Sequence, residues 1–174
     1  MNPMRVRHEF SALLMLLSSI AGSGQRAAAK WTEYVFVKDG FAITSPAAPN
    51  PHRSTQLGDA TAYTVHFPDT NEGITLRVLH QPHECGTYLG ELKRGVLAGK
   101  QAGVNPSSLK DISINGYDGV RYESNLKPDR MLEERYYCVK NRFYAFAIIR
   151  SADQPLSADA TRLLSSFRLI SDTP

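Results

Sequence analysis

The hydrophobic and polar positions along residues 31–170 mostly follow the short period of β-strands. The most strongly patterned stretch is Glu134–Ile149, where two runs rich in aromatic and β-branched residues flank a polar Lys140–Asn141 pair. This spacing is typical of a β-hairpin with a tight turn. The second arm, Phe143–Ile149, is apolar or aromatic at seven successive positions. We therefore predict a strand at the centre of a sheet, with both of its faces covered.

Shorter runs of the same kind predict three further strand pairs, each joined by a polar or glycine-containing turn. These pairs are 31–37 with 41–44, 62–67 with 74–81, and 109–114 with 119–124. Between them, Ser45–Pro51 holds three prolines, and we expect it to be a stiff extended loop. Because nearly all of these connections are short, the sheet is expected to be mostly antiparallel.

Two segments change to the period of an amphipathic helix. Apolar residues at spacings of three and four predict one helix from Tyr88 to the region of Gly99–Gly103, with Thr87 as its N-cap. The same spacing predicts a second helix over 156–167, with Ser157 as its N-cap. The pattern as a whole predicts a single α+β domain.

The first 29 residues have a different composition from the rest. Two arginines precede an uncharged run of 13 residues, Phe10–Gly22, and alanines occupy the minus-three and minus-one positions relative to Lys30. This is the pattern of a secretory signal peptide. A membrane anchor is the alternative, but a spanning helix needs about 20 apolar residues. We expect 1–29 to be cleaved and 30–174 to be an exported domain, periplasmic or secreted, without stable membrane insertion.

Removing that segment changes the charge. The chain has 20 Lys and Arg against 17 Asp and Glu, and residues 1–29 hold three of the arginines and one of the glutamates. Residues 30–174 therefore carry 17 basic and 16 acidic side chains. A chain so close to neutral gives no electrostatic reason to expect a nucleic-acid partner. At 145 residues it is the usual size of one domain, and we expect a monomer.

Three short motifs, in this order and spacing, resemble those of the PsbP/DcrB-like fold family, a group that also includes a Ran-binding nuclear import factor. They are Gly40–Pro46, Ile114–Tyr122 and Ser165–Leu169. The resemblance covers most of residues 31–170 and implies an antiparallel sheet sandwiched between helices, the PsbP-like α/β/α arrangement. Many members of this group are assembly or interaction factors without catalysis. The resemblance therefore favours a binding module, and it transfers no active site or cofactor.

Cys85 and Cys138 are the two cysteines of the chain. In an exported domain, a single pair most simply forms one disulfide. Such a bond would tie the segment before the first predicted helix to the central hairpin, with a stabilisation of roughly 4 kcal/mol from chain entropy. Two buried free thiols, or one reactive thiol, are the alternatives.

The segment His80–Cys85 is a candidate metal site. His80, His83 and Cys85 lie within six residues with a carboxylate, Glu84, between them, and these are ligand types for zinc or copper. The competing interpretation is a loop whose histidines are solvated and whose cysteine is already in a disulfide. A metal-binding protein using this loop is thus an alternative function.

Catalytic patterns are weak. Neither a Gly-x-Ser-x-Gly serine outside the first 29 residues nor a phosphate-cradling glycine loop occurs. Acidic residues such as Glu123 and the Glu133–Glu134 pair are interpreted as solubilising charges at sheet edges. We therefore expect no catalytic activity, with an uncharacterised hydrolase as an alternative.

The remaining candidate is a surface on the central hairpin. Adjacent Tyr136 and Tyr137 must face opposite sides of a strand, and tyrosine and arginine are enriched at interfaces. Together with Arg135 and Arg142 they are our candidate contact residues for another protein or a cell-envelope component. Core packing is the alternative for the tyrosines, and solvation for the arginines.

Overall fold

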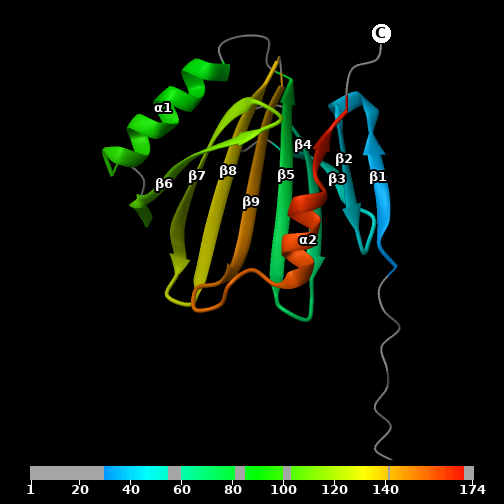
Figure 1. Ribbon diagram of the computed structural model, residues 1–174. Coiled ribbons are helices and arrows are strands. Elements are labelled where there is room, and N and C mark those ends of the chain that lie inside the picture. Colours follow the sequence, from blue (N-terminus) through cyan, green and yellow to red (C-terminus); the bar gives the residue numbers. More distant parts are fainter. Residues whose placement is uncertain (1–29, 55–59, 81–84, 100–102, 141, 171–174) are drawn as a thin grey trace, which may run out of the picture.

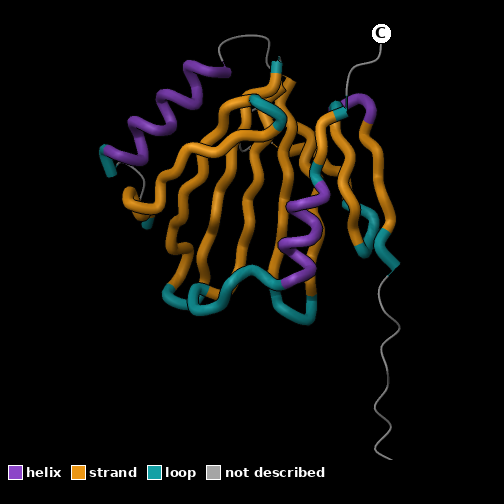
Figure 2. The backbone as a smooth tube through the Cα atoms, viewed as in Figure 1, coloured by secondary structure: helices purple, strands orange, loops and turns teal. Residues whose placement is uncertain are grey.

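The computed structural model describes residues 30–54, 60–80, 85–99, 103–140 and 142–170 of the 174-residue chain. Strands dominate these segments (Figures 1 and 2). In chain order the elements are β1 (Thr32–Phe36), η1 (Val37–Asp39), β2 (Phe41–Ser45), β3 (Asn50–Ser54), β4 (Ala60–Phe67), β5 (Glu72–His80), α1 (Cys85–Leu97), β6 (Val104–Ile114), β7 (Tyr117–Lys127), β8 (Arg130–Val139), β9 (Arg142–Ser151), α2 (Ala158–Ser166) and β10 (Arg168–Leu169).

Seven strands form one large antiparallel sheet in the order β3-β4-β5-β9-β8-β7-β6. β9 is its middle strand and pairs with β8 along its whole length. The predicted hairpin at the centre of the sheet is therefore confirmed. β1, β2 and β10 form a separate three-stranded sheet.

The three other predicted strand pairs are confirmed as β1–β2, β4–β5 and β6–β7. The β6–β7 turn contains Asn115 at φ 48° and Gly116 at φ 82°, the left-handed pair that makes Asn-Gly a strong hairpin signal. One strand was not expected. β3 begins inside the segment predicted to be an extended loop, and its first four residues are exposed.

Alternation along β9 places large side chains on both faces of the large sheet. Tyr144, Phe146 and Ile148 point to one side, which we call the aromatic face, and they pack with residues of β2 and α2. Phe143 and Ala145 point to the other side, the α1 face, and pack with Leu89 and Val96 of α1. The clusters on the two faces have no residue in common. The predicted two-sided burial is confirmed, since Phe143 to Ile148 are all buried.

The expected sandwich between helices is not supported. The aromatic face is covered by the small β1-β2-β10 sheet together with α2, and the α1 face by a single helix. Figure 1 shows α2 lying along β5 and α1 next to β6. Over the described residues, the fold is a mostly antiparallel sheet with two α-helices in one domain.

Both helices differ slightly from their predicted limits. α1 begins at Cys85, so Thr87 lies in its first turn and is not its N-cap. For α2 the predicted cap is confirmed, because the Ser157 hydroxyl accepts a hydrogen bond from the amide of Ala160 at 3.1 Å. The predicted signal peptide lies outside the described residues. Within those residues, neither helix has the length and apolar character needed to cross a membrane.

Candidate functional site

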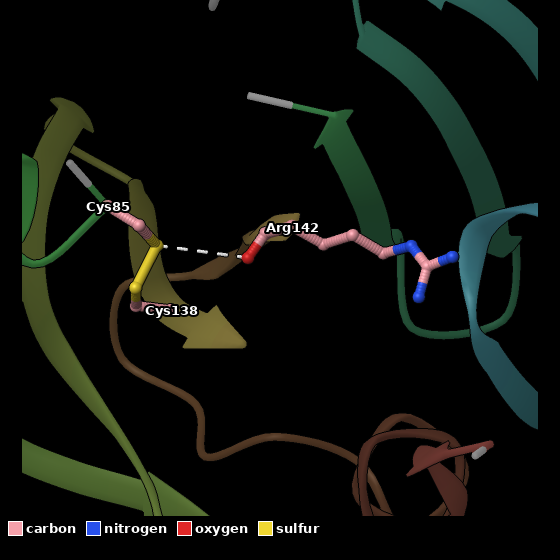
Figure 3. Close-up of a disulfide and its surroundings, with 3 residues drawn as sticks. All are labelled: Cys85, Cys138 and Arg142. Carbon is pink, nitrogen blue, oxygen red and sulfur yellow. Dashed lines mark hydrogen bonds between the residues drawn. A yellow bond between two sulfur atoms is a disulfide. The ribbon is translucent and has the colours of Figure 1, made fainter. Parts of the chain in front are cut away.

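The two cysteines are joined. Cys85 at the start of α1 and Cys138 in β8 form a disulfide with a Cα–Cα distance of 5.5 Å. The sulfur of Cys85 also lies 3.8 Å from the backbone oxygen of Arg142 (Figure 3). The predicted pairing is confirmed, and in this state neither sulfur is available as a nucleophile or metal ligand.

Tyr136 and Tyr137 face opposite sides of β8, as predicted, but both are buried, at 4% and 9% exposure. Tyr136 lies on the α1 face, with its ring 6.0 Å from that of Tyr122 and 5.5 Å from that of Phe143. Tyr137 lies on the aromatic face, 6.2 Å from the ring of Phe146. The two rings therefore belong to the core, and the expected interaction surface is not built from them.

The Tyr136 hydroxyl donates a hydrogen bond to Glu134 at 2.7 Å and lies 3.5 Å from the Tyr122 hydroxyl. Burial, followed by the charge of Glu134, raises the pKa of Tyr136 far above its ordinary value. The phenol thus stays protonated and acts as a structural donor.

Arg135 belongs to a cluster of alternating charges on the aromatic face of β7, β8 and β9. We call this cluster the charged patch. Its members are Arg121, Glu123, Glu133, Arg135 and Arg150. Arg121 pairs with Arg135 across β7 and β8, and Glu123 pairs with Glu133.

Glu133 is the centre of the charged patch, because it is 5% exposed and its neighbours are half-buried. Its carboxylate accepts a hydrogen bond from Arg135 Nε at 2.6 Å and lies 3.9 Å from Arg121. Glu123 lies 3.7 Å from Arg121 and 3.4 Å from Arg150. Three guanidinium groups against two carboxylates leave the patch with one excess positive charge. Sequence reasoning treated both glutamates as solvated, because cross-strand neighbours are far apart along the chain.

Arg142 has a different role. Its Nη2 donates to the backbone oxygen of Lys38 at 3.4 Å, and a Cβ at Gly40 would lie 2.5 Å from its Nη1. Gly40 also has φ +71°. The guanidinium group therefore packs under the turn between β1 and β2, and glycine at position 40 allows this approach.

Beside this turn, the side chain of Asp39 is 2% exposed. Its Oδ1 lies 2.6 Å from Nε2 of His80, its other oxygen accepts a hydrogen bond from the Tyr63 hydroxyl, and its backbone oxygen accepts one from Tyr144 at 2.7 Å. Burial, followed by Asp39, raises the pKa of Tyr63 well above its ordinary value, which keeps Tyr63 a donor. The only sequence signal for Asp39 was a turn-forming Asp-Gly pair.

An open pocket of about 540 Å³ lies next to His80. It is lined by residues of η1, β3, β4 and β5, namely Lys38, Pro51, His52, Arg53, Ala60, Thr61 and His80. We call it the His80 pocket. Its lining brings together side chains from four segments that are separate in sequence.

The disulfide and the contact between His80 and Asp39 engage two of the residues that were candidates for a metal site, Cys85 and His80. Cys85 is in the disulfide and Nε2 of His80 faces Asp39, whereas His83 lies outside the described residues. Among the described residues there is no group of three or more His, Cys, Asp or Glu side chains placed to hold a metal ion. The ligand set expected from the sequence is therefore not assembled in the described part of the chain.

No protein-family model matches the chain, and no curated protein matches it. Among solved structures, it is similar to the solution structure of cyanobacterial PsbP (CyanoP) from Synechocystis sp. PCC 6803, with a TM-score of 0.53 and 13% sequence identity. The match covers 88% of this chain and 98% of that chain. The chain has a PsbP-like fold. A crystal structure from Bacteroides thetaiotaomicron VPI-5482 is also similar, with a TM-score of 0.53 and 10% identity, over 80% of this chain and 48% of that chain.

The three motifs of the sequence resemblance occupy structural positions in this PsbP-like fold. Gly40–Pro46 contains β2, Ile114–Tyr122 contains the β6–β7 turn, and Ser165–Leu169 joins α2 to β10. Within the second motif, a Cβ at Gly119 would lie 2.4 Å from the backbone oxygen of Tyr136. The motifs thus report packing and turns, and at these sequence identities the similarity shows the fold alone.

Proposed function

We propose that this chain is an exported, non-catalytic binding module that contacts another protein or a cell-envelope component through the charged patch. The observation that carries the proposal is the arrangement of three arginines around Glu133 and Glu123 on a sheet face. Arg121 and Arg135 remain 28% and 24% exposed while their positions are fixed by carboxylates.

Fixed arginines suit binding for two reasons. Arginine is enriched among the residues that dominate interface energies, and a side chain that is already ordered loses less entropy when a partner arrives. The excess positive charge favours a partner surface with acidic groups. The charged patch also includes Arg135, which the sequence already placed among the candidate contact residues.

The position of the patch supports the same function. The small sheet and α2 pack in one cluster with β4, β5, β9 and the Tyr137–Val139 end of β8, whereas all patch residues except Glu133 are only half-buried. Figure 1 shows β7 and β8 with no helix of the described residues in front of them on the side where α2 lies. On this face the charged patch therefore lies beside the covered cluster, where its side chains keep part of their surface exposed.

Export is supported by the amino-terminal pattern of residues 1–29 together with the disulfide, because disulfides persist in oxidising compartments. The PsbP-like fold is compatible with this proposal but does not identify a partner.

The proposal is tested by capture of partners from the cell-envelope fraction on immobilised protein. Arg121→Ala is the informative variant, because Arg121 is the most exposed patch arginine and its carboxylates lie at the longer distances of 3.7 and 3.9 Å. We expect it to reduce capture about ten-fold, in line with the loss of one charged interface contact. The matched control is Arg168→Ala, which removes an arginine paired with Glu33 on the small sheet and should leave capture unchanged.

Equal capture by wild type and Arg121→Ala would contradict the charged patch as the binding surface. Turnover of any compound in a hydrolase substrate screen, abolished by a substitution in the protein, would contradict the non-catalytic function. Thermal unfolding of both variants shows whether a lost interaction reflects a lost fold.

A further inference from the structure

The His80 pocket is separate from the charged patch and is lined mainly by basic side chains. Four of its seven lining residues are Lys38, His52, Arg53 and His80, and none of the seven carries a carboxylate. Its volume of about 540 Å³ is within the usual range for small-molecule sites. Among the described residues, basic side chains without a carboxylate beside them favour an anion over a cation.

In the described part of the chain, Asp39 contacts the pocket residue His80 but is itself withdrawn from solvent. Asp39 is buried, and its two oxygens are engaged by Tyr63 and His80. An ionised carboxylate only accepts hydrogen bonds, so Nε2 of His80 must carry the proton in this contact. Nδ1 is then the ring nitrogen that remains for a ligand, on a side chain that is 41% exposed. Asp39 thus fixes the orientation of the imidazole at the pocket.

Lys38 supplies a positive group, from η1. Its side chain is exposed, and its ammonium makes no ion pair with any residue in the described part of the chain. Arg53 adds a guanidinium group from β3, on the edge of the large sheet. Two positive groups from different segments, Lys38 and Arg53, therefore line one hollow together with the ring of His80, and such an arrangement suits a multivalent anion.

We propose that the His80 pocket binds the phosphate group of a small ligand or of a lipid headgroup, with Lys38 and Arg53 as its charged donors and His80 as part of its wall. Phosphate fits better than a carboxylate because it presents more acceptor oxygens and up to two charges, which Arg and Lys recognise through charge-assisted hydrogen bonds. The proposal does not depend on the function of the charged patch, since the two sites share no residue.

The experiment is an NMR titration of the purified protein with inorganic phosphate, against sodium chloride at matched ionic strength. We expect phosphate to shift the imidazole resonances of His80 and the backbone amides of Lys38 and Arg53, and chloride to leave them unchanged. Lys38→Ala should weaken phosphate binding about ten-fold, the effect of losing one hydrogen bond to a charged group. Because Lys38 is exposed, this variant should keep its fold.

His80→Gln is the second variant, because its amide can still donate to Asp39 while the imidazole ring is lost from the pocket wall. It should also weaken binding. The matched control is Lys127→Ala, which removes an exposed lysine at the β7–β8 turn and should bind phosphate like the wild type.

A second arm identifies the source of the phosphate. Phosphatidylcholine vesicles that contain phosphatidic acid are compared with vesicles of phosphatidylcholine alone. Binding to the former that Lys38→Ala weakens supports a lipid headgroup, and shifts with inorganic phosphate alone support a soluble ligand. The proposal is overturned if neither probe shifts His80, or if Lys127→Ala weakens binding as much as Lys38→Ala, because the attraction is then non-specific.

Discussion

The two faces of the large sheet are held together by different means. On the aromatic face, the ring of Phe167 at the end of α2 packs against three other rings. Its centroid lies 5.6 Å from that of Phe41, 5.6 Å from that of Tyr144 and 5.0 Å from that of Phe146. On the α1 face, Leu89 and Val96 are the buried residues of α1, and the disulfide fixes the start of the helix. Aromatic packing thus holds α2 on the sheet, whereas α1 buries only two side chains among its described residues and is also held by the disulfide.

The sequence of α1 explains why the tether is useful. The helix contains Gly86, Gly90 and Gly95, and glycine in a helix interior costs about 1 kcal/mol relative to alanine. α2 contains no glycine and has a hydrogen-bonded N-cap. The helix whose sequence has the lower helix propensity, α1, is therefore the one that is cross-linked to the sheet.

The largest expected effect comes from removing the centre of the aromatic packing. Phe167→Ala should destabilise the protein by about 3–5 kcal/mol, because it leaves a cavity among buried rings. Urea unfolding measures the change. The control is Leu126→Ala, whose side chain is 49% exposed and whose loss should cost within about 0.5 kcal/mol. A loss of less than about 1 kcal/mol for Phe167→Ala would contradict the aromatic packing as the main support of α2.

The second prediction tests the tether. Replacing both cysteines, by Cys85→Ala with Cys138→Ala, should cost about 2–4 kcal/mol, because the unfolded chain loses the constraint of a 53-residue separation. Amide hydrogen exchange should speed up more in α1 than in α2. Reduced wild-type protein should behave like the double variant. Equal loss of protection in the two helices would break the distinction between the faces.

The third prediction concerns the polar attachment of the small sheet to the aromatic face. Asp39→Ala should destabilise the protein by about 1–3 kcal/mol, because it leaves the buried Tyr63 hydroxyl without its acceptor. Adding Tyr63→Phe to this variant should restore part of the loss, although Tyr63→Phe alone destabilises the wild type. A double-mutant cycle from urea unfolding measures the coupling, and strictly additive changes would show that the two side chains do not depend on each other.

The sequence predicted the elements whose signal is local. The Asn115–Gly116 turn and the Ser157 cap are examples, because each depends on neighbouring residues. β3 was not predicted, because it is an edge strand that contains Pro51 and mostly exposed residues and so shows no apolar alternation. The separate β1-β2-β10 sheet on the aromatic face was not predicted for a different reason. A hairpin pattern does not reveal whether its strands join the large sheet or form a small one of their own.

The candidate sites were less predictable, because they depend on contacts between distant residues. The period of β8 placed Tyr136 and Tyr137 on opposite faces, but not the covering that buries each of them. Asp39 meets Tyr63 and His80 across separations of 24 and 41 residues, and no local pattern marks such a meeting. Glu133 looked like a solubilising charge until cross-strand pairing placed it beside Arg121 and Arg135.

The smallest expected effect distinguishes the two helices by pH. Glu72 is buried and accepts hydrogen bonds from the Ser157 amide at 2.9 Å, from the Ser157 hydroxyl and from Thr70 at 2.7 Å. Burial alone would raise the pKa of Glu72, but the bonds from Ser157 and Thr70 outweigh it and hold that pKa below its ordinary value of 4.5. The stabilisation is therefore complete above the unfolded-state pKa and is lost as the pH falls through the folded-state pKa.

Between about pH 6 and about pH 3, wild type should lose stability that Glu72→Gln does not lose, by about 1 kcal/mol or less, the size of one hydrogen bond. Urea unfolding across this range measures both profiles, and amide exchange should show the loss first at the start of α2. Glu91→Gln, on the exposed side of α1, is the control and should keep the wild-type profile. Because the disulfide at α1 does not titrate in this range, acid should weaken the attachment of α2 more than that of α1. Parallel profiles for wild type and Glu72→Gln would mean that the cap of α2 is not tied to the charge of Glu72.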